Sequence, residues 1–257
     1  MATKLFDDII FGPVHSRRLG LSLGVNLLPT DNKLCSFECI YCECGWTKAG
    51  GRMRFNSRED VARMLGEKLR EMVAAGTPPD VITFAGNGEP TLHPDFEAII
   101  DDTIALRDRI CPTAKISVLS NASNIGRESV RRALLRVDNN ILKLDSAFDR
   151  TVCLVDAPRG DYSVERTVEN MILFEGHLIV QTMFLRGECG GKPVDNTTPR
   201  EVDAWLEIVR RIAPRSVMIY TLDRDTPVQT LEKVPLEELK SIAARVEALG
   251  IPCSVAG

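Results

Sequence analysis

Three cysteines near the N-terminus have a spacing that could support metal or redox chemistry. Cys35, Cys39 and Cys42 form the pattern C-x3-C-x2-C, and Cys44 follows after one further residue. Disulfides are disfavoured, because the opening stretch MATKLFDDIIFG lacks the apolar segment of a signal peptide. We therefore predict a cytoplasmic protein, in which thiols stay reduced and clustered cysteines more often bind metal or carry redox chemistry.

Two kinds of metal site could be built from this loop. A closed structural zinc site needs four protein ligands, and Cys44 would be a cramped fourth ligand so close to Cys42. A four-iron cluster ordinarily takes four cysteines. Three cysteines would leave one iron open to bind another molecule, which would give the cluster a chemical task. The residues alone leave both alternatives open.

Composition limits the class of protein. The chain has 257 residues, of which 44% are hydrophobic and 26% charged, as in ordinary globular proteins. Lys and Arg number 32 and Asp and Glu 36, so the formal charge is 32 − 36 = −4. This balance argues against a general nucleic-acid binder, although a local basic patch would be compatible with it. No apolar run approaches the roughly 18 residues of a membrane span, so no membrane association is predicted.

Six short apolar runs are each followed by a segment with helical periodicity. The runs are nearly continuous in apolar residues rather than alternating, as in parallel strands covered on both faces. The predicted strands span residues 21–28, 81–85, 115–120, 140–144, 177–185 and 216–222. The predicted helices span residues 57–76, 93–110, 124–137, 163–174, 198–212 and 234–250.

This order of elements predicts an α/β fold with right-handed crossovers and a parallel sheet. Six strand–helix units are too few for a complete eight-fold barrel, so we expect a partial (β/α)6 barrel of the TIM type. The chain shows no linker or low-complexity tract, and one domain over residues 1–257 is the simplest interpretation. In such folds function concentrates in the loops after the strands, and the cysteine triad lies in the first of these loops.

Polar residues in or after the apolar runs raise a second question. Lys143 and Asp145 share one face of the fourth predicted strand, because side chains alternate along a strand. Pointing into a small barrel, they are unfavourable unless they bind each other or a ligand. Gln181 lies in the middle of the apolar fifth strand and poses the same question. A structural pair or a buried hydrogen bond is the alternative to a binding role.

The cysteine pattern resembles the signature of radical S-adenosylmethionine (SAM) enzymes. Tyr41 fills the aromatic position before the last cysteine. The resemblance implies a [4Fe-4S] cluster held by Cys35, Cys39 and Cys42, whose open iron chelates the amino and carboxylate groups of SAM. It further implies reductive cleavage to methionine and a 5′-deoxyadenosyl radical that abstracts hydrogen from a substrate. An electron donor such as flavodoxin or ferredoxin would be a partner.

The resemblance extends to the loops after the next strands. FAGNGEP lies where the superfamily has a Gly-Gly-Glu-type motif that meets the methionine end of SAM, although Asn87 separates the two glycines. Glycines permit close backbone approach, and a carboxylate can accept the ammonium group; the alternative is an ordinary turn with a solvated glutamate. LSNAS lies where related enzymes contact the ribose or the methionine carboxylate. The cofactor-binding candidates are Tyr41, Gly86, Gly88, Glu89, Ser120, Asn121, Lys143, Asp145 and Gln181.

The stretch before the cysteines points to one branch of the superfamily. FGPVHSRRLGLSLGVNLLP resembles the GP-x-x-SRR-x-G-x-S-x-G opening of the wyosine-synthetase-like, tRNA-modifying family, and the resemblance continues through GEPTLHPDFEAII and TMFLRG. The tRNA enzymes of that family build a tricyclic base from N1-methylguanosine and pyruvate, and they carry a second cluster on extra N-terminal cysteines. This sequence has no cysteine before Cys35. We therefore expect the family's core fold without its tRNA reaction.

Five residues are candidates for substrate binding. Arginines bind carboxylates bidentately, so Arg17 and Arg18, beside His15, could contact an anionic ligand, or could form a solvated turn. Tyr220 and Arg224 lie at the end of the sixth predicted strand, where the substrate would enter.

Three functional hypotheses follow. The first is hydrogen abstraction from a small-molecule or nucleoside substrate. The second is activation of a partner protein by generating a glycyl radical on it. The third is a non-enzymatic module that senses zinc or iron. Cys44, Cys153 and Cys189 could approach the functional edge and join an auxiliary cluster, but no compact motif connects them.

Overall fold

The computed structural model describes residues 4–16, 20–48 and 54–257. Its helices are α1 (Arg58–Ala74), α2 (Phe96–Ile110), α3 (Glu128–Leu134), α4 (Asp149–Val155), α5 (Val164–Ile172), α6 (Pro199–Ile212) and α7 (Leu236–Glu247), with a 3-10 turn at Pro90–Leu92. Its strands are β1 (Ile10–Ser16), β2 (Gly20–Val25), β3 (Val81–Phe84), β4 (Lys115–Ser120), β5 (Asn139–Lys143), β6 (Ile179–Met183), β7 (Leu185–Cys189), β8 (Lys192–Asp195), β9 (Ser216–Tyr220), β10 (Leu231–Lys233) and β11 (Cys253–Ala256).

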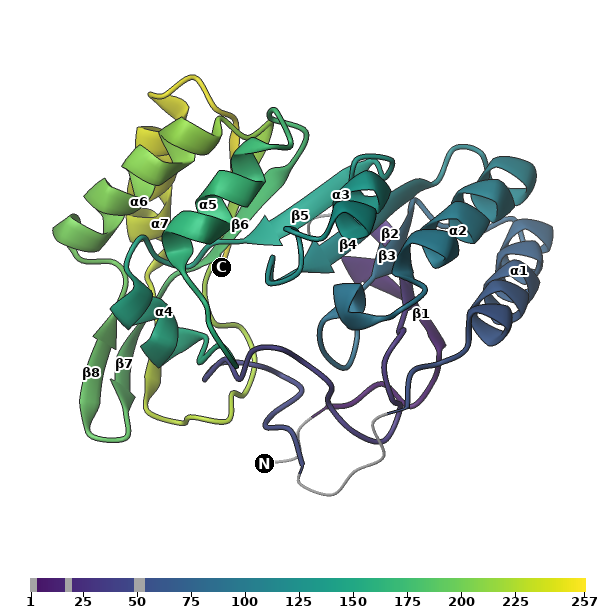
Figure 1. The fold of residues 1–257 in the computed structure, drawn as a ribbon, viewed down its shortest axis with the longest axis horizontal. Coiled ribbons are helices and arrows are strands. Elements are labelled where there is room, and N and C mark those ends of the chain that lie inside the picture. Colours follow the sequence, from purple (N-terminus) through teal and green to yellow (C-terminus); the bar gives the residue numbers. More distant parts are fainter. Residues whose placement is uncertain (1–3, 17–19, 49–53) are drawn as a thin grey trace.

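The main sheet is a curved, mostly parallel sheet with the order β1-β2-β3-β4-β5-β6-β9-β11. The strands from β2 to β11 are parallel, and only β1 pairs antiparallel. Most of the helices cover the outer face of this sheet, while the long loops gather at one end of its strands (Figure 1). The predicted α/β partial barrel is confirmed, because all six predicted strands contribute to neighbouring positions in its sheet.

The main helices form where the sequence pattern predicts them. The hydroxyl of Ser57 accepts a hydrogen bond from the backbone N–H of Asp60 and so caps α1. Val61, Leu65 and Leu69 recur at helical spacing and are buried against the sheet. The same logic holds for α6, whose large residues face the core.

The core lies between the sheet and its helices. Trp205 of α6 is its largest fully buried side chain. The indole N–H of Trp205 donates to the carbonyl of Leu144 at 3.1 Å, and its ring meets Phe184 edge-on at 5.3 Å. Burial of this amphipathic ring with its N–H satisfied fixes α6 against the ends of β5 and β6.

Several elements were not predicted. β11 adds a further parallel strand, and β1 adds an antiparallel edge. The single strand predicted over 177–185 is wrong in its last part, because β6 ends at Met183 and Leu185 starts β7 in another sheet. This second sheet has the order β10-β7-β8 and is antiparallel.

A smaller apolar cluster connects the second sheet to the cysteine loop. Phe37 and Tyr41 of the loop pack with Val155 of α4 and with Leu185 and Val194 of the second sheet. The β7–β8–β10 sheet therefore packs against the cysteine loop and does not extend the barrel.

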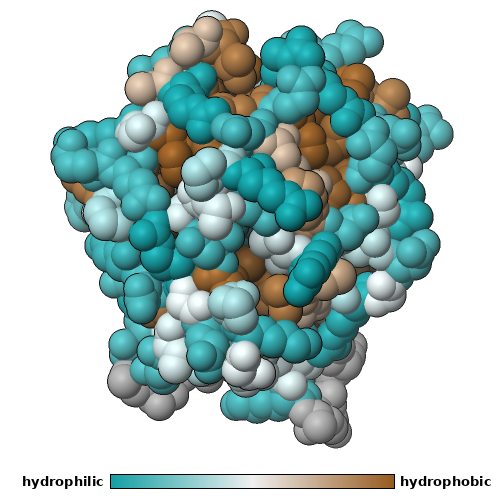
Figure 2. Space-filling model, turned by 90° about the vertical axis from the view of Figure 1, so that its left-hand side faces the viewer, coloured by the Kyte–Doolittle hydropathy of each residue, from teal (hydrophilic) through white to brown (hydrophobic). Residues whose placement is uncertain are grey.

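Figure 2 shows one face on which hydrophilic residues predominate and apolar groups appear in patches between them. Among the helices described, none is long and apolar enough to cross a membrane.

Candidate functional site

The cysteine loop connects β2 to α1 and is held on two sides. On one side, the backbone N–H of Leu34 donates to the carbonyl of Asn87 at 2.8 Å, and Leu34 forms an isolated parallel bridge with Gly88. On the other side, the N–H of Ile40 donates to the carbonyl of Val155 at 2.9 Å. The loop therefore lies between the glycine motif after β3 and the end of α4.

The three thiols of the loop differ in their surroundings. Cys39 is buried, whereas Cys35 and Cys42 are partly exposed. The Cys35 sulfur accepts from the N–H of Phe37 at 3.4 Å and from Asn121 Nδ2 at 3.6 Å. Burial raises the pKa of the Cys35 thiol to about 12. Binding of a metal centre would therefore have to release protons from the loop.

The cysteine loop offers thiol donors of the kind that bind a metal ion or an iron–sulfur cluster. Across residues 4–16, 20–48 and 54–257, no three His, Cys, Asp or Glu side chains are gathered as ligands of one metal ion. A tetrahedral zinc site would draw its sulfurs to about 2.3 Å from one point. A four-iron cluster takes each thiolate on a different iron, so its three ligands stand further apart. Cys35, Cys39 and Cys42 would supply the three thiolates that a cluster with one open iron needs.

Backbone geometry requires both glycines of the motif after β3. Gly88 has φ +140°, and a Cβ atom there would lie 1.9 Å from the carbonyl oxygen of Leu34. Gly86 has φ +134°, and its Cβ would lie 2.6 Å from Asn26 Oδ1. A side chain at Gly88 would push the cysteine loop away from β3, and one at Gly86 would displace the side chain of Asn26.

The asparagine between the two glycines anchors the N-terminal segment. Asn87 is fully buried. Its Oδ1 accepts from the N–H of Phe6 at 2.8 Å, and its Nδ2 donates to the carbonyls of Phe6 at 2.9 Å and Pro29 at 2.7 Å. Asn87 therefore has a structural task that a glycine could not perform.

The glutamate of the motif is buried rather than solvated. Glu89 is 2% exposed. Its carboxylate accepts from Ser120 Oγ at 2.8 Å, from the N–H of Asn121 at 2.6 Å and from the N–H of Thr91 at 3.1 Å. Burial raises the pKa of Glu89, although these hydrogen bonds oppose the shift. In the described part of the chain no cationic side chain forms an ion pair with it.

Lys143 and Asp145 form an ion pair with each other, which is the arrangement expected of a structural pair. Lys143 Nζ is 3.1 Å from Asp145 Oδ2 and 3.6 Å from Asp156 Oδ1. The hydroxyl of Tyr41 donates to Asp145 and, at 3.3 Å, to Asp156. Asp156 Oδ1 is also 3.2 Å from the thiol of Cys39, which donates to it. This buried network ties β5 to the cysteine loop.

Asp156 was missed by sequence reasoning. It directly follows α4, a seven-residue helix that the apolar periodicity did not reveal. Burial, together with the neighbouring charge of Asp145, raises the pKa of Asp156 to about 7. The nearest sequence signal is the apolar stretch before it, which carries no indication of a buried carboxylate.

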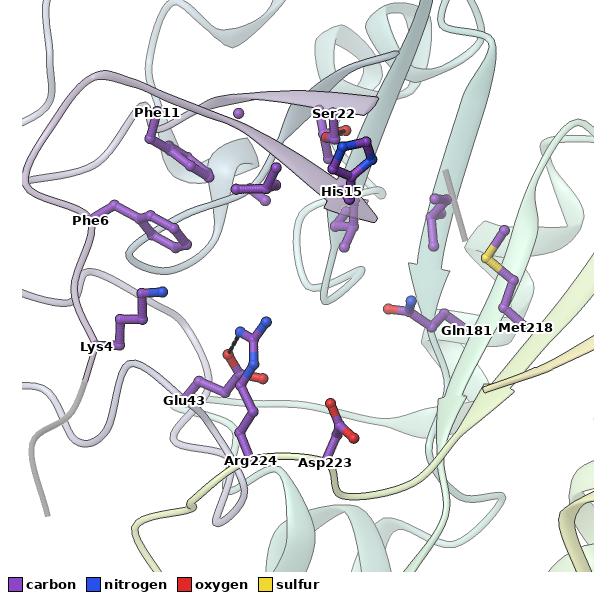
Figure 3. Close-up of a pocket in the computed structure, with 16 residues that line it drawn as sticks. Lys4, Phe6, Phe11, His15, Ser22, Glu43, Gln181, Met218, Asp223 and Arg224 are labelled. Carbon is purple, nitrogen blue, oxygen red and sulfur yellow. Dashed lines mark hydrogen bonds and ion pairs between the residues drawn. The ribbon is translucent and has the colours of Figure 1, made fainter. Parts of the chain in front are cut away.

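A cavity of about 360 Å³ opens on the inner face of the main sheet. Figure 3 shows Gln181 and Met218 on one side of it and Phe6 and Phe11 on the other. Gln181 therefore points into the barrel lumen, as its position in an apolar strand predicted. Leu119 of β4, Ile141 of β5 and Met218 of β9 give this wall of the cavity an apolar lining, and β6 adds the amide of Gln181.

Charged side chains stand around the cavity. Arg224 donates to the carboxylate of Glu43 at 2.5 Å, and both line the cavity with Lys4 and His15 (Figure 3). Tyr220 instead packs against the apolar cluster below the cysteine loop. The structure thus brings His15 and Arg224 together at one cavity and places Tyr220 apart from its lining.

The radical SAM superfamily model matches residues 32–188, which span the cysteine loop, the glycine motif and the strands up to β7. The chain belongs to the radical SAM superfamily. It is an enzyme of that class, and the superfamily implies SAM and a [4Fe-4S] cluster as cofactors.

Two relatives extend the similarity beyond this core. The chain is 37% identical over 183 residues to UPF0026 protein MJ1312 of Methanocaldococcus jannaschii, which covers 69% of this chain and 54% of that protein. It is 33% identical over 250 residues to a UPF0026 protein of Helicobacter pylori, which covers 94% of this chain and 74% of that protein. The chain therefore spans about half the length of the first relative and three quarters of the second.

Solved structures share the radical SAM fold at low identity. A radical SAM methyltransferase from Sphaerobacter thermophilus superposes with a TM-score of 0.67 at 15% identity, over 91% of this chain and 65% of that one. TYW1 with a lysine-pyruvate adduct superposes with a TM-score of 0.64 at 14% identity, over 88% of this chain and 73% of that one. These likenesses establish the partial barrel.

Cys44, Cys153 and Cys189 lie on three different elements of the structure. Cys44 donates to the carbonyl of Gly86 at 3.4 Å, Cys153 is exposed on α4, and Cys189 lies partly buried on β7. Arg17 and Arg18 lie outside the described residues.

Proposed function

We propose that the chain binds a [4Fe-4S] cluster through Cys35, Cys39 and Cys42 and uses it to cleave SAM reductively. When bound, the cluster would supply the electron that converts SAM to methionine and the 5′-deoxyadenosyl radical. This radical would abstract hydrogen from a small-molecule or nucleoside substrate. A cytoplasmic electron donor such as flavodoxin or ferredoxin would reduce the cluster.

One observation carries the proposal: Asn121 contacts both halves of the expected site. Its backbone N–H donates to Glu89 at 2.6 Å, and its side-chain amide donates to Cys35 Sγ at 3.6 Å. Asn121 thus lies in space between a carboxylate and a thiol of the proposed cluster site. This is the juxtaposition needed for a ligand that binds an iron and carries an ammonium group.

The charge of Glu89 also favours a cationic ligand. A buried carboxylate that accepts only from neutral donors keeps much of its desolvation penalty. The ammonium group of SAM would offset this penalty through a charge-assisted hydrogen bond. Ser120 and Asn121 would then act by holding Glu89 in place, which differs from the direct contacts that the family resemblance implied.

The lumen supports a small substrate. A cavity of about 360 Å³ between the sheet and the N-terminal segment suits a metabolite or nucleoside better than a folded polypeptide. Gln181 can offer both a donor and an acceptor from the cavity wall. His15 and Arg224 stand where they could bind an anionic part of such a substrate.

The test is cleavage of SAM by the anaerobically reconstituted and reduced protein. We expect 5′-deoxyadenosine and methionine in wild type and neither product in Cys42→Ala. Cys253→Ala, whose thiol lies on β11 away from the loop, is the matched control and should keep the activity. Iron uptake without any 5′-deoxyadenosine under reducing conditions would contradict the proposal.

A further inference from the structure

A buried lysine lies at the base of the cysteine loop. Lys33 precedes Cys35 by two residues, and its side chain is 1% exposed. Its Nζ donates to the carbonyl of Gly45 at 2.9 Å and to Glu38 Oε2 at 3.3 Å. The N–H of Gly45 donates in turn to the carbonyl of Cys42 at 2.8 Å. The ammonium group thus joins the start of the loop to the turn after its last thiol.

Lys33 shares its carboxylate partner with other donors. Glu38 is its carboxylate partner, but the same carboxylate also accepts from Arg159 and, at 3.2 Å, from the N–H of Thr47. An ammonium group has three donors, and Gly45 and Glu38 are the two acceptors that the described residues provide. Burial of a cation is unfavourable unless anions or acceptors compensate for it. The loop therefore contains a positive charge with capacity to stabilise a further anion.

The bound centre would supply this anion. Thiolates and an iron–sulfur cluster carry net negative charge, and reduction adds one more negative charge. Cluster potentials depend on net charge, on hydrogen bonds to sulfur and on solvent exposure. A fixed cation within the loop stabilises the reduced form more than the oxidised form.

We propose that Lys33 is a positioning residue whose buried ammonium group holds the cysteine loop closed and raises the reduction potential of the cluster. This inference rests on the proposed function, because it needs a cluster at Cys35, Cys39 and Cys42. It assigns a task to a residue outside the cysteine pattern.

Two substitutions separate an electrostatic role from a purely structural one. Lys33→Met removes the charge from a side chain of similar length, and Glu38→Gln removes the opposing charge while keeping an amide that can accept a hydrogen bond. Both break the same ion pair, so a merely structural role predicts the same effect on both. An electrostatic role predicts that their potentials shift in opposite directions.

The experiment is a redox titration of the reconstituted cluster, followed by the electron paramagnetic resonance signal of its reduced form. We expect Lys33→Met to lower the ratio of reduced to oxidised cluster about tenfold at a fixed potential, a shift of about 59 mV for one electron. Glu38→Gln should raise that ratio. Arg159→Met, which removes a half-exposed partner of Glu38, is the control and should have a smaller effect.

The outcomes are distinguishable. Equal potentials in all variants, or shifts of Lys33→Met and Glu38→Gln in the same direction, would overturn the inference. If Lys33→Met takes up no iron, an unchanged potential in Glu38→Gln overturns it equally. A wild-type protein that binds no cluster would instead refute the proposed function itself.

Discussion

Buried charges in this protein concentrate at one edge of the sheet. Lys33, Glu89, Asp145 and Asp156 are each almost fully buried and lie around the cysteine loop. Elsewhere, ion pairs such as Arg58–Asp102 are exposed, and exposed pairs contribute only about 0–1 kcal/mol to stability. Burying so many charges together is unfavourable for folding. A charged ligand bound at the loop would offset part of this cost by pairing with a buried group of opposite sign.

Glu89 provides a prediction at this scale. Glu89→Gln removes the negative charge that would accept the ammonium group of SAM, a charge-assisted hydrogen bond of about 1.5–3 kcal/mol. We therefore expect the affinity for SAM to fall by one to two orders of magnitude, with iron content retained. Titration calorimetry on the reconstituted protein measures the change.

The control for Glu89 is another buried glutamate. Glu201 of α6 accepts from Ser146 Oγ and Thr151 Oγ1, each at 2.6 Å, and neither partner belongs to the cysteine loop. Glu201→Gln should cost some stability but leave SAM binding unchanged. Equal loss of affinity in both variants would show that the effect at Glu89 is one of folding, not of recognition.

At the scale of elements, the parallel strands could be predicted because their pattern is local. Residues 81–85 are a nearly continuous apolar run, and β3 (Val81–Phe84) occupies most of it. The second sheet could not be predicted, since β7 and β8 have mixed burial and β10 joins them from a distant part of the chain. Pairing between distant short strands leaves no periodic signal.

The part of the candidate site that lies in the loops directly after the strands was predictable from the sequence. Lys143 ends β5 and Asp145 follows it by two residues, so their closeness was predictable from local sequence. The role of Asn87, by contrast, depends on contacts with Phe6 and Pro29, and Asp156 depends on a helix too short to predict. Contacts between loops that are far apart in sequence are set by tertiary packing, which a single sequence does not display.

The attachment of the second sheet gives a prediction for an element. Asn196, at the end of β8, donates to the carbonyls of Asp145 at 2.8 Å and Met183 at 2.7 Å and accepts from the N–H of Leu185 at 2.9 Å. Asn196→Ala leaves these buried groups without a partner, which costs about 1–3 kcal/mol for each group left unpaired. We expect faster hydrogen exchange in β7 and β8, with β2 to β4 unchanged.

Lys192→Ala is the matched change at an exposed position of β8 in the same sheet, and it should leave exchange as in wild type. If Asn196→Ala speeds exchange throughout the main sheet as well, the asparagine stabilises the whole fold rather than the attachment of one sheet.

For the whole molecule, the architecture places two surfaces against one loop. The end of the parallel sheet brings the glycine motif and Asn121 to the cysteines, while α4 and the second sheet support them from the other side. The loop is therefore a clamped segment at a junction, and the cavity opens beside it on the inner face of the sheet. Reduction of the proposed cluster, SAM binding and substrate entry would all take place at this junction.

The number of clusters is the prediction that tests the molecule as a whole. Cys44 is held at Gly86, Cys153 faces solvent on α4, and Cys189 lies on β7, so these thiols belong to separate elements and would need to converge to bind a second cluster. We expect the fully reconstituted protein to contain about four iron and four sulfide per chain. Cys153→Ala and Cys189→Ala should leave these values unchanged, whereas Cys35→Ala should abolish them. Iron analysis near eight per chain, lowered by either of the first two substitutions, would instead show that these loops converge on a second cluster and would bring the molecule closer to the tRNA enzymes it resembles.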